Sequence, residues 1–345
     1  MNVGLNNIIA AIPAPWKFTF GTIAWFVLIS VLHFKINVDE GERQVISMGY
    51  MPVISNMAAP ILDQASKENG KYRFKALKFS SFAEMAEALR NGEIHAAFMI
   101  APLSIVLHQQ GESIKVVLFG NGNESTLVTR KGLNIKSLHD LRGKQVAVPM
   151  RYSGHNLSIL ELINKNGLEG EIKVVEMNPP DMASALASGV LDAYYVGEPF
   201  AIKTLKSGDS ELLFYAEDVW PHFFSNLTLV KQDFINKDPA AVKALVHGAV
   251  RAVQWAKRNQ TQAAKISSKY WNQPLELVTY ALENPPNRTN FDRYVPQMDE
   301  MRKIVRLMKQ FGLTDSIDVE GVVDDSFARQ APLDNITTIE SVLKQ

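Results

Sequence analysis

The fold of this chain follows from the stretch Gln145–Leu162, which reads Gln-Val-Ala-Val-Pro-Met-Arg-Tyr-Ser-Gly-His-Asn-Leu-Ser-Ile-Leu-Glu-Leu. The apolar run Val146–Val148 predicts a buried parallel strand, and apolar residues at helical spacing begin at Leu157. The turn between them is polar and contains glycine. A strand that enters a helix through such a turn leaves free backbone N–H groups, and these favour an anionic or strongly polar ligand.

Four residues occupy that turn and the first helical positions: Ser153, Gly154, His155 and Asn156. We expect them to contact a ligand. For Ser153 and Asn156 the alternative is a helix-capping role. For His155 the alternative is a hydrogen bond to the backbone.

The composition is that of an ordinary globular protein, with 46% hydrophobic and 21% charged residues in a chain of 345. This length predicts two domains. Basic and acidic residues number 36 each, so the chain lacks the basic excess of nucleic-acid-binding proteins and we expect no nucleic-acid partner. The absence of cysteine excludes disulfides, thiolate metal sites, a cysteine nucleophile and an acylated lipoprotein cysteine.

Histidines and hydroxyl residues give no sign of a metal site or a hydrolase. The other histidines are scattered without the spacing of metal ligands, so we predict no metal and no cofactor. Ser125, Thr126 and Ser153 lack the context of a nucleophile elbow.

The N-terminal residues 1–35 are predicted to be a membrane anchor or a signal segment. No charged residue falls within Phe18–Phe34, and a membrane-spanning helix needs about 17–25 residues. No small-x-small cleavage site follows the apolar run, which favours an uncleaved transmembrane helix over a signal peptide. Residues 36–44 are charged and are interpreted as a linker.

A sequence pattern recurs after 97 residues, so that Met85-Ala86 returns as Met182-Ala183. Each copy predicts alternating strands and helices, which are typical of parallel α/β sheets. Two similar α/β units predict two lobes. The other matched positions are Asn69-Gly70 with Asn166-Gly167, Ala88-Leu89 with Ala185-Leu186, Gly92 with Gly189, Ala96 with Ala193 and Pro102 with Pro199.

We assign residues 45–126 and 231–345 to lobe 1 and residues 127–230 to lobe 2. Ligands of such sheets bind beyond the carboxyl ends of the strands, which here would line a cleft between the lobes. The C-terminal third predicts helices, whose large side chains we interpret as packing residues. These helices are expected at Pro239–Asn259, Gln262–Trp271, Leu275–Leu282 and Asp292–Phe311.

Several segments together resemble the periplasmic substrate-binding proteins of ABC importers for nitrate, bicarbonate, sulfonates, taurine and thiamine precursors. They keep their order along the chain, and the resemblance spans about Val45 to Ala256. The segments are Phe98–Leu103 (Phe-Met-Ile-Ala-Pro-Leu), Ser153–Leu157 (Ser-Gly-His-Asn-Leu), Asn178–Met182 (Asn-Pro-Pro-Asp-Met), Val196–Phe200 (Val-Gly-Glu-Pro-Phe) and Asp218–His222 (Asp-Val-Trp-Pro-His).

This resemblance implies an α/β, two-lobed, periplasmic-binding-protein-like fold of type II with parallel-rich sheets. It also implies a small-molecule ligand, an ABC permease with its ATPase as partners, and a position at the outer face of the membrane. The chain departs from the family in two ways. Nitrate-type members carry a cation where this chain reads Phe223–Asn226, which argues against nitrate. The usual member is released or lipid-anchored, whereas this one is predicted to be tethered by its own helix.

The predicted site residues each have an alternative role. Glu198 could accept from a ligand cation or N–H group, or could pair with Arg151. Tyr50 and Trp220 could contact the ligand or pack in the core. The full predicted ligand-binding set is Tyr50, Pro52, Met99, Pro102, Asn121, Asn123, Ser153, Gly154, His155, Asn156, Gly197, Glu198, Trp220 and Ser225.

Three classes of function are compatible with these patterns. The first is a membrane-tethered solute-binding protein of an ABC importer. The second is a ligand-sensing ectodomain that acts through a separate signalling partner. The third is an enzyme like the thiamine pyrimidine synthases, which share the fold but carry a cysteine-rich motif that this chain lacks.

Overall fold

The computed structural model describes residues 14–38 and 43–344. The chain divides into two compact units, Met1–Gln44 and Val45–Gln345. Residues 1–13 of the predicted anchor and residues 39–42 of the predicted linker lie outside the described residues.

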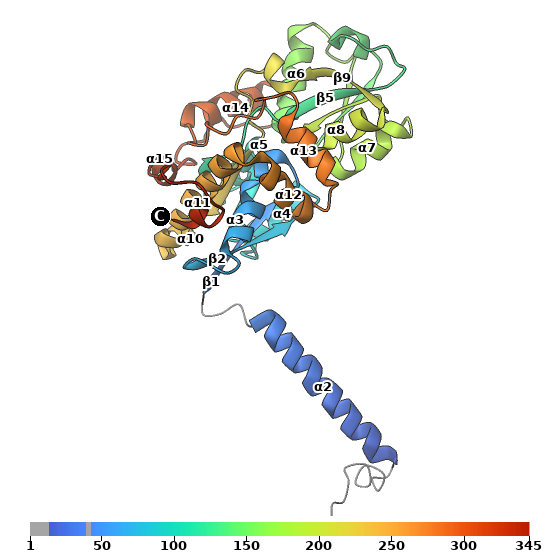
Figure 1. The fold of residues 1–345 in the computed structure, drawn as a ribbon. Helices are drawn as coiled ribbons and strands as arrows, with labels where there is room; N and C mark the ends of the chain where they lie inside the picture. Colours follow the sequence, from blue (N-terminus) through green and yellow to red (C-terminus); the bar gives the residue numbers. More distant parts are fainter. Residues whose placement is uncertain (1–13, 39–42, 345) are drawn as a thin grey trace, which may run out of the picture. The chain divides into compact units, whose positions relative to one another are not determined.

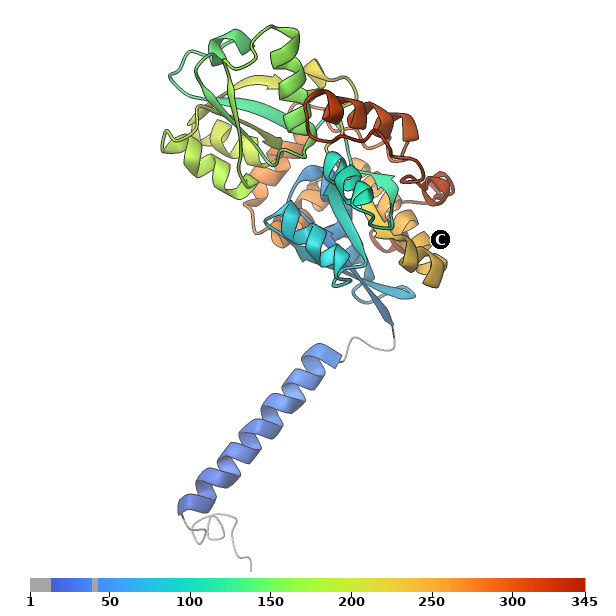
Figure 2. The same ribbon diagram turned by 180° about the vertical axis from the view of Figure 1, so that it is seen from behind.

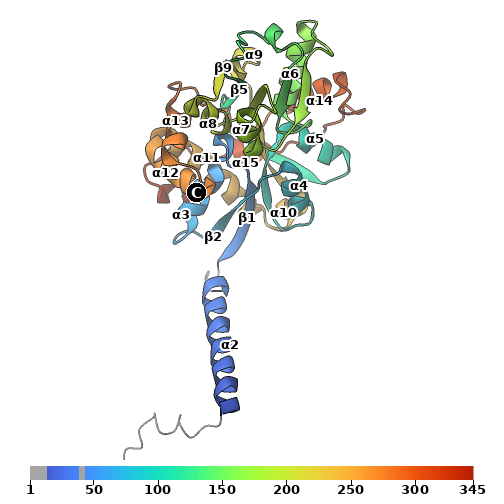
Figure 3. The ribbon, with the colours of Figure 1, turned by 90° about the vertical axis from the view of Figure 1, so that its right-hand side faces the viewer.

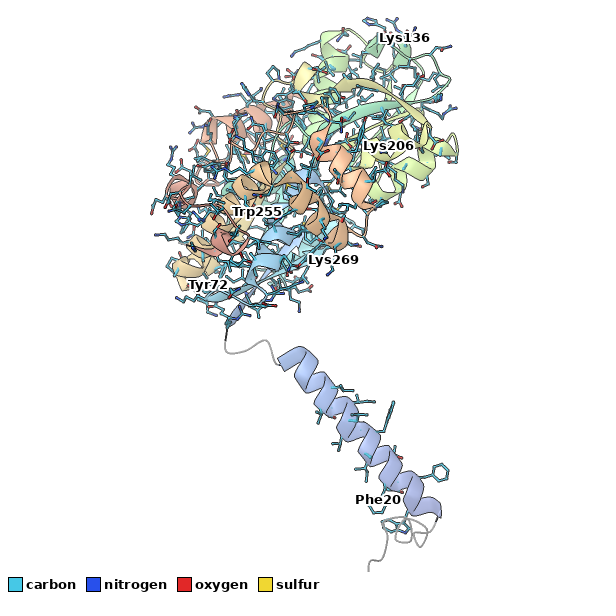
Figure 4. All side chains as sticks on the ribbon, viewed as in Figure 1. Phe20, Tyr72, Lys136, Lys206, Trp255 and Lys269 are labelled. Atoms are coloured by element: carbon cyan, nitrogen blue, oxygen red, sulfur yellow. The ribbon has the colours of Figure 1, made fainter. Side chains whose placement is uncertain are left out.

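The first unit contains helix α2 (Ala14–Val38). Its large apolar side chains are exposed, including Trp25 and Phe26 and also Phe20, which Figure 4 labels. Over the part of the chain that the structure describes, no helix is both long and apolar enough to cross a membrane. The predicted transmembrane helix is therefore not supported.

The second unit contains two five-stranded sheets. The first sheet has the order β2-β1-β3-β10-β4. Strand β1 pairs in parallel with β3, whereas β10 is antiparallel to both β3 and β4. These strands are β1 (Gln44–Tyr50), β2 (Tyr72–Lys78), β3 (Ala96–Ile100), β4 (Ile114–Phe119) and β10 (Asn226–Lys231).

The second sheet has the order β7-β6-β8-β5-β9, which repeats the pattern of the first. Strand β6 is parallel to β7 and β8, and β5 is antiparallel to β8 and β9. Figures 1 and 2 show the two sheets with their helices at opposite ends of this unit. The strands are β5 (Ser125–Arg130), β6 (Gln145–Val148), β7 (Lys173–Glu176), β8 (Ala193–Gly197) and β9 (Ser210–Tyr215).

The repeat in the sequence corresponds to this repeated topology. Helix α4 (Phe82–Arg90) and helix α7 (Pro179–Ala187) occupy equivalent places, as do β3 and β8. The sheets are mixed, however, and not simply parallel-rich. The chain leaves the first sheet at the carboxyl end of β4 and enters the second sheet near the carboxyl end of β8. The entering strand β5 must therefore run against its neighbours, and β10 does the same on the return.

Helices cover both sheets, and the C-terminal helix α14 contacts a helix beside each sheet. Helix α11 packs on α3 and β2, whereas α13 contacts α8 and α14 contacts both α5 and α6. Figure 3 shows α12 and α13 on one side of the unit and α5 and α14 on the other.

The division into lobes at 126/127 and 230/231 stays a prediction. The helices not bounded above are α3 (Ala58–Ser66), α5 (Ala101–Gln109), α6 (Gly154–Lys165), α8 (Phe200–Ser207), α9 (Ala216–Val219), α10 (Gln232–Lys237), α11 (Pro239–Arg258), α12 (Gln260–Trp271), α13 (Leu275–Glu283), α14 (Met298–Gln310) and α15 (Ser326–Arg329), with short 3-10 turns η1 (Ile54–Asn56), η2 (Leu138–Leu141) and η3 (Glu340–Leu343).

One helix start was predicted wrongly. The helix expected at Asp292–Phe311 begins only at Met298. Pro296 lacks a backbone N–H and disfavours helical geometry in the residue before it, so the chain stays irregular up to that point. This irregular segment, residues 284–297, connects α13 and α14.

The core side chains agree with the packing role predicted for the C-terminal helices. Trp255 of α11 is 1% exposed and Trp271 of α12 is 2% exposed. Figure 4 labels Trp255. It also labels Lys206 of α8, which forms an ion pair with Glu276 of α13.

Candidate functional site

The two sheets meet at a junction near the carboxyl ends of their strands. The Ile54 backbone N–H donates to the Glu198 carbonyl oxygen over 2.9 Å, and Asn121 Nδ2 donates to the Ile54 carbonyl oxygen over 3.2 Å. Because Ile54 follows β1 and Glu198 follows β8, these bonds join the two sheets directly. We call the polar side chains gathered here the junction network: Ser55, Asn56, Glu124, Ser125, Thr126, His155, Glu198, Ser225, Asn226 and Arg288.

Glu124 lies at the centre of the junction network, immediately before β5, and is 1% exposed. Its Oε1 accepts from Ser225 Oγ at 2.6 Å and from Ser125 Oγ at 3.1 Å. Its Oε2 accepts from the Glu198 backbone N–H at 3.1 Å. Burial raises the pKa of Glu124 to about 8, although the Ser225 and Ser125 hydroxyls and Arg288 oppose this rise. The carboxyl therefore tends to hold its proton at neutral pH.

Glu198 is the second buried carboxylate of the network, and it has a cation beside it. Its Oε1 lies 3.8 Å from the Arg288 guanidinium and accepts from Thr126 Oγ1 at 2.5 Å. Its Oε2 accepts from the Ile202 backbone N–H at 3.0 Å. Burial raises the pKa of Glu198, and Arg288 is the strongest influence against it.

Arg288 comes from the irregular segment between α13 and α14 and reaches the second sheet. It donates to Glu217 Oε1 at 2.7 Å, to Thr126 Oγ1 at 3.1 Å and to the Ser125 carbonyl oxygen at 2.5 Å. Its guanidinium also stacks 3.9 Å from the centre of the Tyr215 ring. These contacts place most of its donors on the second sheet.

The partner predicted for Glu198 is thereby corrected. Arg151 was the cation in one of the two alternatives for Glu198, but its guanidinium lies 5.6 Å from the Tyr152 ring centre and its backbone N–H donates to Glu176. Arg288 takes the place of Arg151 because the tertiary fold brings residues 284–297 to the junction.

His155 is part of the same chain of hydrogen bonds and is 3% exposed. Its Nε2 lies 2.9 Å from Ser125 Oγ. When Ser125 Oγ donates its hydrogen to the Glu124 carboxylate, Nε2 donates to Ser125, which leaves Nδ1 as an acceptor. The ring packs edge-on against Tyr195 and Phe223, and burial lowers the pKa of His155 to about 3. The imidazole is therefore neutral at physiological pH.

Asn226 ends the network on the side of the first sheet. Its Nδ2 donates to Asn56 Oδ1 at 2.8 Å and to Ser55 Oγ at 2.9 Å. Asn56 Nδ2 in turn donates to backbone carbonyls, which fixes the orientation of both amides. Among the described residues, His155 Nδ1 and Asn226 Oδ1 are the buried side-chain atoms of this network that have no hydrogen-bond partner. Both are acceptors.

Five of the residues predicted from the sequence come together at this junction: Asn121, His155, Gly197, Glu198 and Ser225. Gly197 shows how tightly they are packed, because a Cβ added there would lie 2.7 Å from Glu124 Oε2. The backbone of β8 thus lies directly against the carboxyl group, and only glycine allows this approach.

Three further predicted residues form the start of α6. Ser153 Oγ accepts from the Asn156 backbone N–H at 3.1 Å, and Asn156 Nδ2 donates to the Arg151 carbonyl oxygen at 2.7 Å. Gly154 lies against the Phe223 ring. These contacts are those of the capping alternative.

The remaining predicted residues lie outside the junction network. Tyr50 is in the core and donates its hydroxyl to the Tyr270 carbonyl oxygen at 3.2 Å, which favours its packing alternative. Trp220 packs edge-on against Phe223. Asn123 lines a small cavity of about 10 Å³. Pro52, Met99 and Pro102 are buried beside the ends of β1 and β3.

Two residues that dominate the junction were not predicted. Glu124 falls in the crossing segment, where the ligand prediction was made for the neighbouring Asn121 and Asn123, with turn chemistry as their alternative. A charged residue directly before an apolar strand was the available signal. Arg288 had no local signal, because its role depends on a segment that is distant in sequence from everything it binds.

Comparisons with known proteins agree with this architecture. The profile of the NMT1-like family matches residues 39–269. The taurine-binding periplasmic protein of Escherichia coli K12 is 32% identical over 183 residues, which are 51% of this chain and 55% of that protein. This chain thus spans about half the length of that curated relative.

Solved structures share the fold. The ligand-binding component of an ABC-type import system from Staphylococcus aureus has a TM-score of 0.75 at 22% identity, covering 84% of this chain and all (100%) of that one. The periplasmic nitrate-binding protein of Synechocystis has a TM-score of 0.77 at 16% identity, covering 86% and 92%. These relatives and structures are binding proteins rather than enzymes.

Proposed function

Since this chain belongs to the NMT1-like family, we propose that it is the solute-binding component of an ABC importer. It binds a small polar or anionic molecule at the junction of its two sheets and delivers it to a permease driven by an ATPase. Similarity to a taurine-binding periplasmic protein supports this function.

The observation that carries the proposal is the junction network itself. Two buried carboxyl groups, Glu124 and Glu198, lie where chain segments from both sheets meet. A structural core would not need such groups, because burying ionisable side chains is unfavourable unless they are paired. The two groups lie near the carboxyl ends of strands, where ligands of α/β sheets bind, so a polar ligand at the junction accounts for them.

The ligand classes open to this site are sulfonates, taurine-like compounds, nitrate and thiamine precursors. A neutral His155 already uses its one N–H on Ser125 and supplies no positive charge. Arg288 is already paired with Glu217. A bare inorganic anion is therefore disfavoured, and a larger molecule with several polar groups fits the available side chains better. The residues that we propose to bind it are the predicted set above together with Glu124, Ser125 and Asn226.

A thermal-shift panel tests the binding function. Each ligand class is added separately to the unliganded protein, and a true ligand at 100 times its dissociation constant should stabilise the fold by about 2.7 kcal/mol. Small-angle scattering on the same samples should give a radius of gyration that falls with ligand, as expected for closure. If no compound of these classes raises the melting temperature, the proposal is wrong.

We also propose that helix α2 tethers the chain to a membrane. The exposed apolar side chains of α2, such as Trp25 and Phe26, support it, because water does not favour a long apolar helix surface. The full chain should then stay with membranes after an alkaline carbonate wash. Release into the wash would remove the tether and leave the binding function as proposed.

A further inference from the structure

With Glu124 in its carboxylate form, the junction network has more hydrogen-bond acceptors and more negative charge than it can satisfy. The bonds run without a break from His155 through Ser125 and Glu124 to Ser225. On the other side of Ser225, Ser55 connects to Asn226. The two unpartnered atoms, His155 Nδ1 and Asn226 Oδ1, are both acceptors on residues that are 3% and 2% exposed. An anion would add further acceptors here and leave these atoms unsatisfied.

The charges of the junction network also disfavour an anion. Glu124 and Glu198 are both buried, and the cation that lies near them is Arg288. Arg288 gives its strongest contacts to Glu217 and to the β5 backbone, and it lies 3.8 Å from Glu198. The hydrogen-bond partners of Glu124 are two hydroxyls and one backbone N–H, all of them neutral. If both glutamates are ionised, the network therefore has an excess of negative charge.

We propose that the ligand carries a cationic amine whose N–H groups pair with the Glu124 carboxylate, so that Glu124 selects amine-bearing ligands over bare anions. This inference rests on the proposed binding function and narrows its ligand class. An ammonium group supplies three donors and one positive charge, which are the two things that this network lacks.

This pairing predicts that Glu124 changes its protonation state when the ligand binds. Without ligand the buried carboxyl tends to be protonated, with Glu198 and burial favouring the neutral form and Arg288 opposing it. The other titratable groups beside it are His155, which is neutral, and the Tyr195 phenol. An ammonium at Glu124 favours the carboxylate, so the proton should leave as the ligand binds.

Two matched pairs of probes test the selectivity. Taurine is compared with 2-hydroxyethanesulfonate, and β-alanine with 3-hydroxypropionate, so that each pair differs by an ammonium in place of a hydroxyl. Titration calorimetry should show that the amine of at least one pair binds about 10- to 100-fold more tightly than its hydroxyl analogue, as expected for a charge-assisted bond. Equal affinities, or tighter binding of the hydroxyl compounds, would overturn the inference while the binding function stands.

Variants at Glu124 test the assignment to this residue. Glu124→Gln keeps the shape of the side chain, so the fold should survive, and it should weaken binding of the amine by a similar factor with little effect on the hydroxyl analogue. Glu211→Gln removes an exposed acid on β9 and is the matched control, which should bind like the parent chain. A Glu124→Gln variant that binds the amine as tightly as the control does would show that Glu124 is not the partner.

The release of protons on binding separates a ligand-pairing role of Glu124 from a purely structural role, because a structural residue would not release a proton when the ligand binds. Calorimetry in two buffers of different ionisation enthalpy should show about one proton released per amine bound at pH 7, and less towards pH 9. Glu124→Gln should abolish this pH-dependent release. An unchanged release in the variant contradicts the inference.

The binding experiments distinguish failure of this inference from failure of the proposed function. If none of the four probes binds but another compound of the panel does, only the inference is wrong. If no compound binds at all, both the inference and the proposed function are wrong.

Discussion

Two buried glutamates of the same junction differ in how their charge is compensated. Glu198, in the loop after β8, has the Arg288 guanidinium at 3.8 Å, a hydroxyl and a backbone N–H. Glu124, in the crossing segment before β5, has two hydroxyls and a backbone N–H, all neutral. The charge of Glu198 is therefore compensated within the fold, whereas the carboxylate form of Glu124 has no cation as a direct partner. The difference separates a charge that the fold itself compensates from a charge that, by our proposal, the ligand compensates.

Removing the Arg288 guanidinium should produce the largest loss of stability. Arg288→Met leaves Glu198 and Glu217 without their partner, and breaking a buried pair costs about 3–5 kcal/mol of unfolding free energy. The measurement is chemical denaturation of the unliganded protein. Arg329→Met, which breaks an exposed ion pair with Asp325, is the control and should change stability little. Equal effects of the two variants would mean that Arg288 does not compensate the buried acids.

Removing the imidazole should have the next largest effect. His155→Ala deletes a ring that packs on Tyr195 and Phe223, and it removes the donor to Ser125. We expect a loss of about 1–3 kcal/mol. An open cleft would have predicted an unchanged fold, but the burial of His155 makes it a core residue as well as a site residue. Denaturation and ligand titration of the same variant separate these roles, and a fold of parental stability would show that the ring contributes no packing.

The pH dependence of stability should show the raised pKa of Glu124. The folded pKa of Glu124, about 8, is above its unfolded value of 4.5, so the folded state keeps a proton that the unfolded state loses. Stability should therefore fall as pH rises from 4.5 to 8. Below pH 6.5 His155 acts in the opposite direction, because its lowered pKa makes unfolding take up a proton.

The window from pH 6.5 to 8 excludes His155, but burial raises the pKa of Glu198 as well, so the part due to Glu124 is read from a variant. Across this window Glu124 alone should account for a loss of about 2 kcal/mol of unfolding free energy. Glu124→Gln should flatten this slope, and Glu211→Gln should not. Thermal melts across that range make the comparison, and an identical slope in all three proteins would remove the special role of Glu124.

The smallest effect is expected at the cap of α6. Ser153→Ala removes the acceptor for the Asn156 N–H, and loss of such a cap costs about 1 kcal/mol. Ligand affinity should stay close to that of the parent protein if Ser153 only caps the helix. A marked loss of affinity with little loss of stability would return Ser153 to the ligand site.

The sequence allowed the repeated architecture to be predicted, because each unit is built from local patterns. Apolar runs such as Val146–Val148 and helical spacing such as that around Met85 are set by neighbouring residues. The repetition of this pattern then indicated two similar sheets. The start of α14 was missed for a local reason as well, since the effect of Pro296 on the preceding backbone was overlooked.

The site was only half predictable, and the physical reason is distance along the chain. Gly197 and His155 could be found because strand ends and helix starts are local features that lie at known edges of α/β sheets. The partnership of Glu198 with Arg288, and the lack of a cation at Glu124, depend on segments about a hundred residues apart meeting in one buried place. The sequence by itself determined the two sheets and the loops between them. Only the tertiary structure decided which buried charge is compensated and which is not, because burial and pairing are properties of the assembled junction.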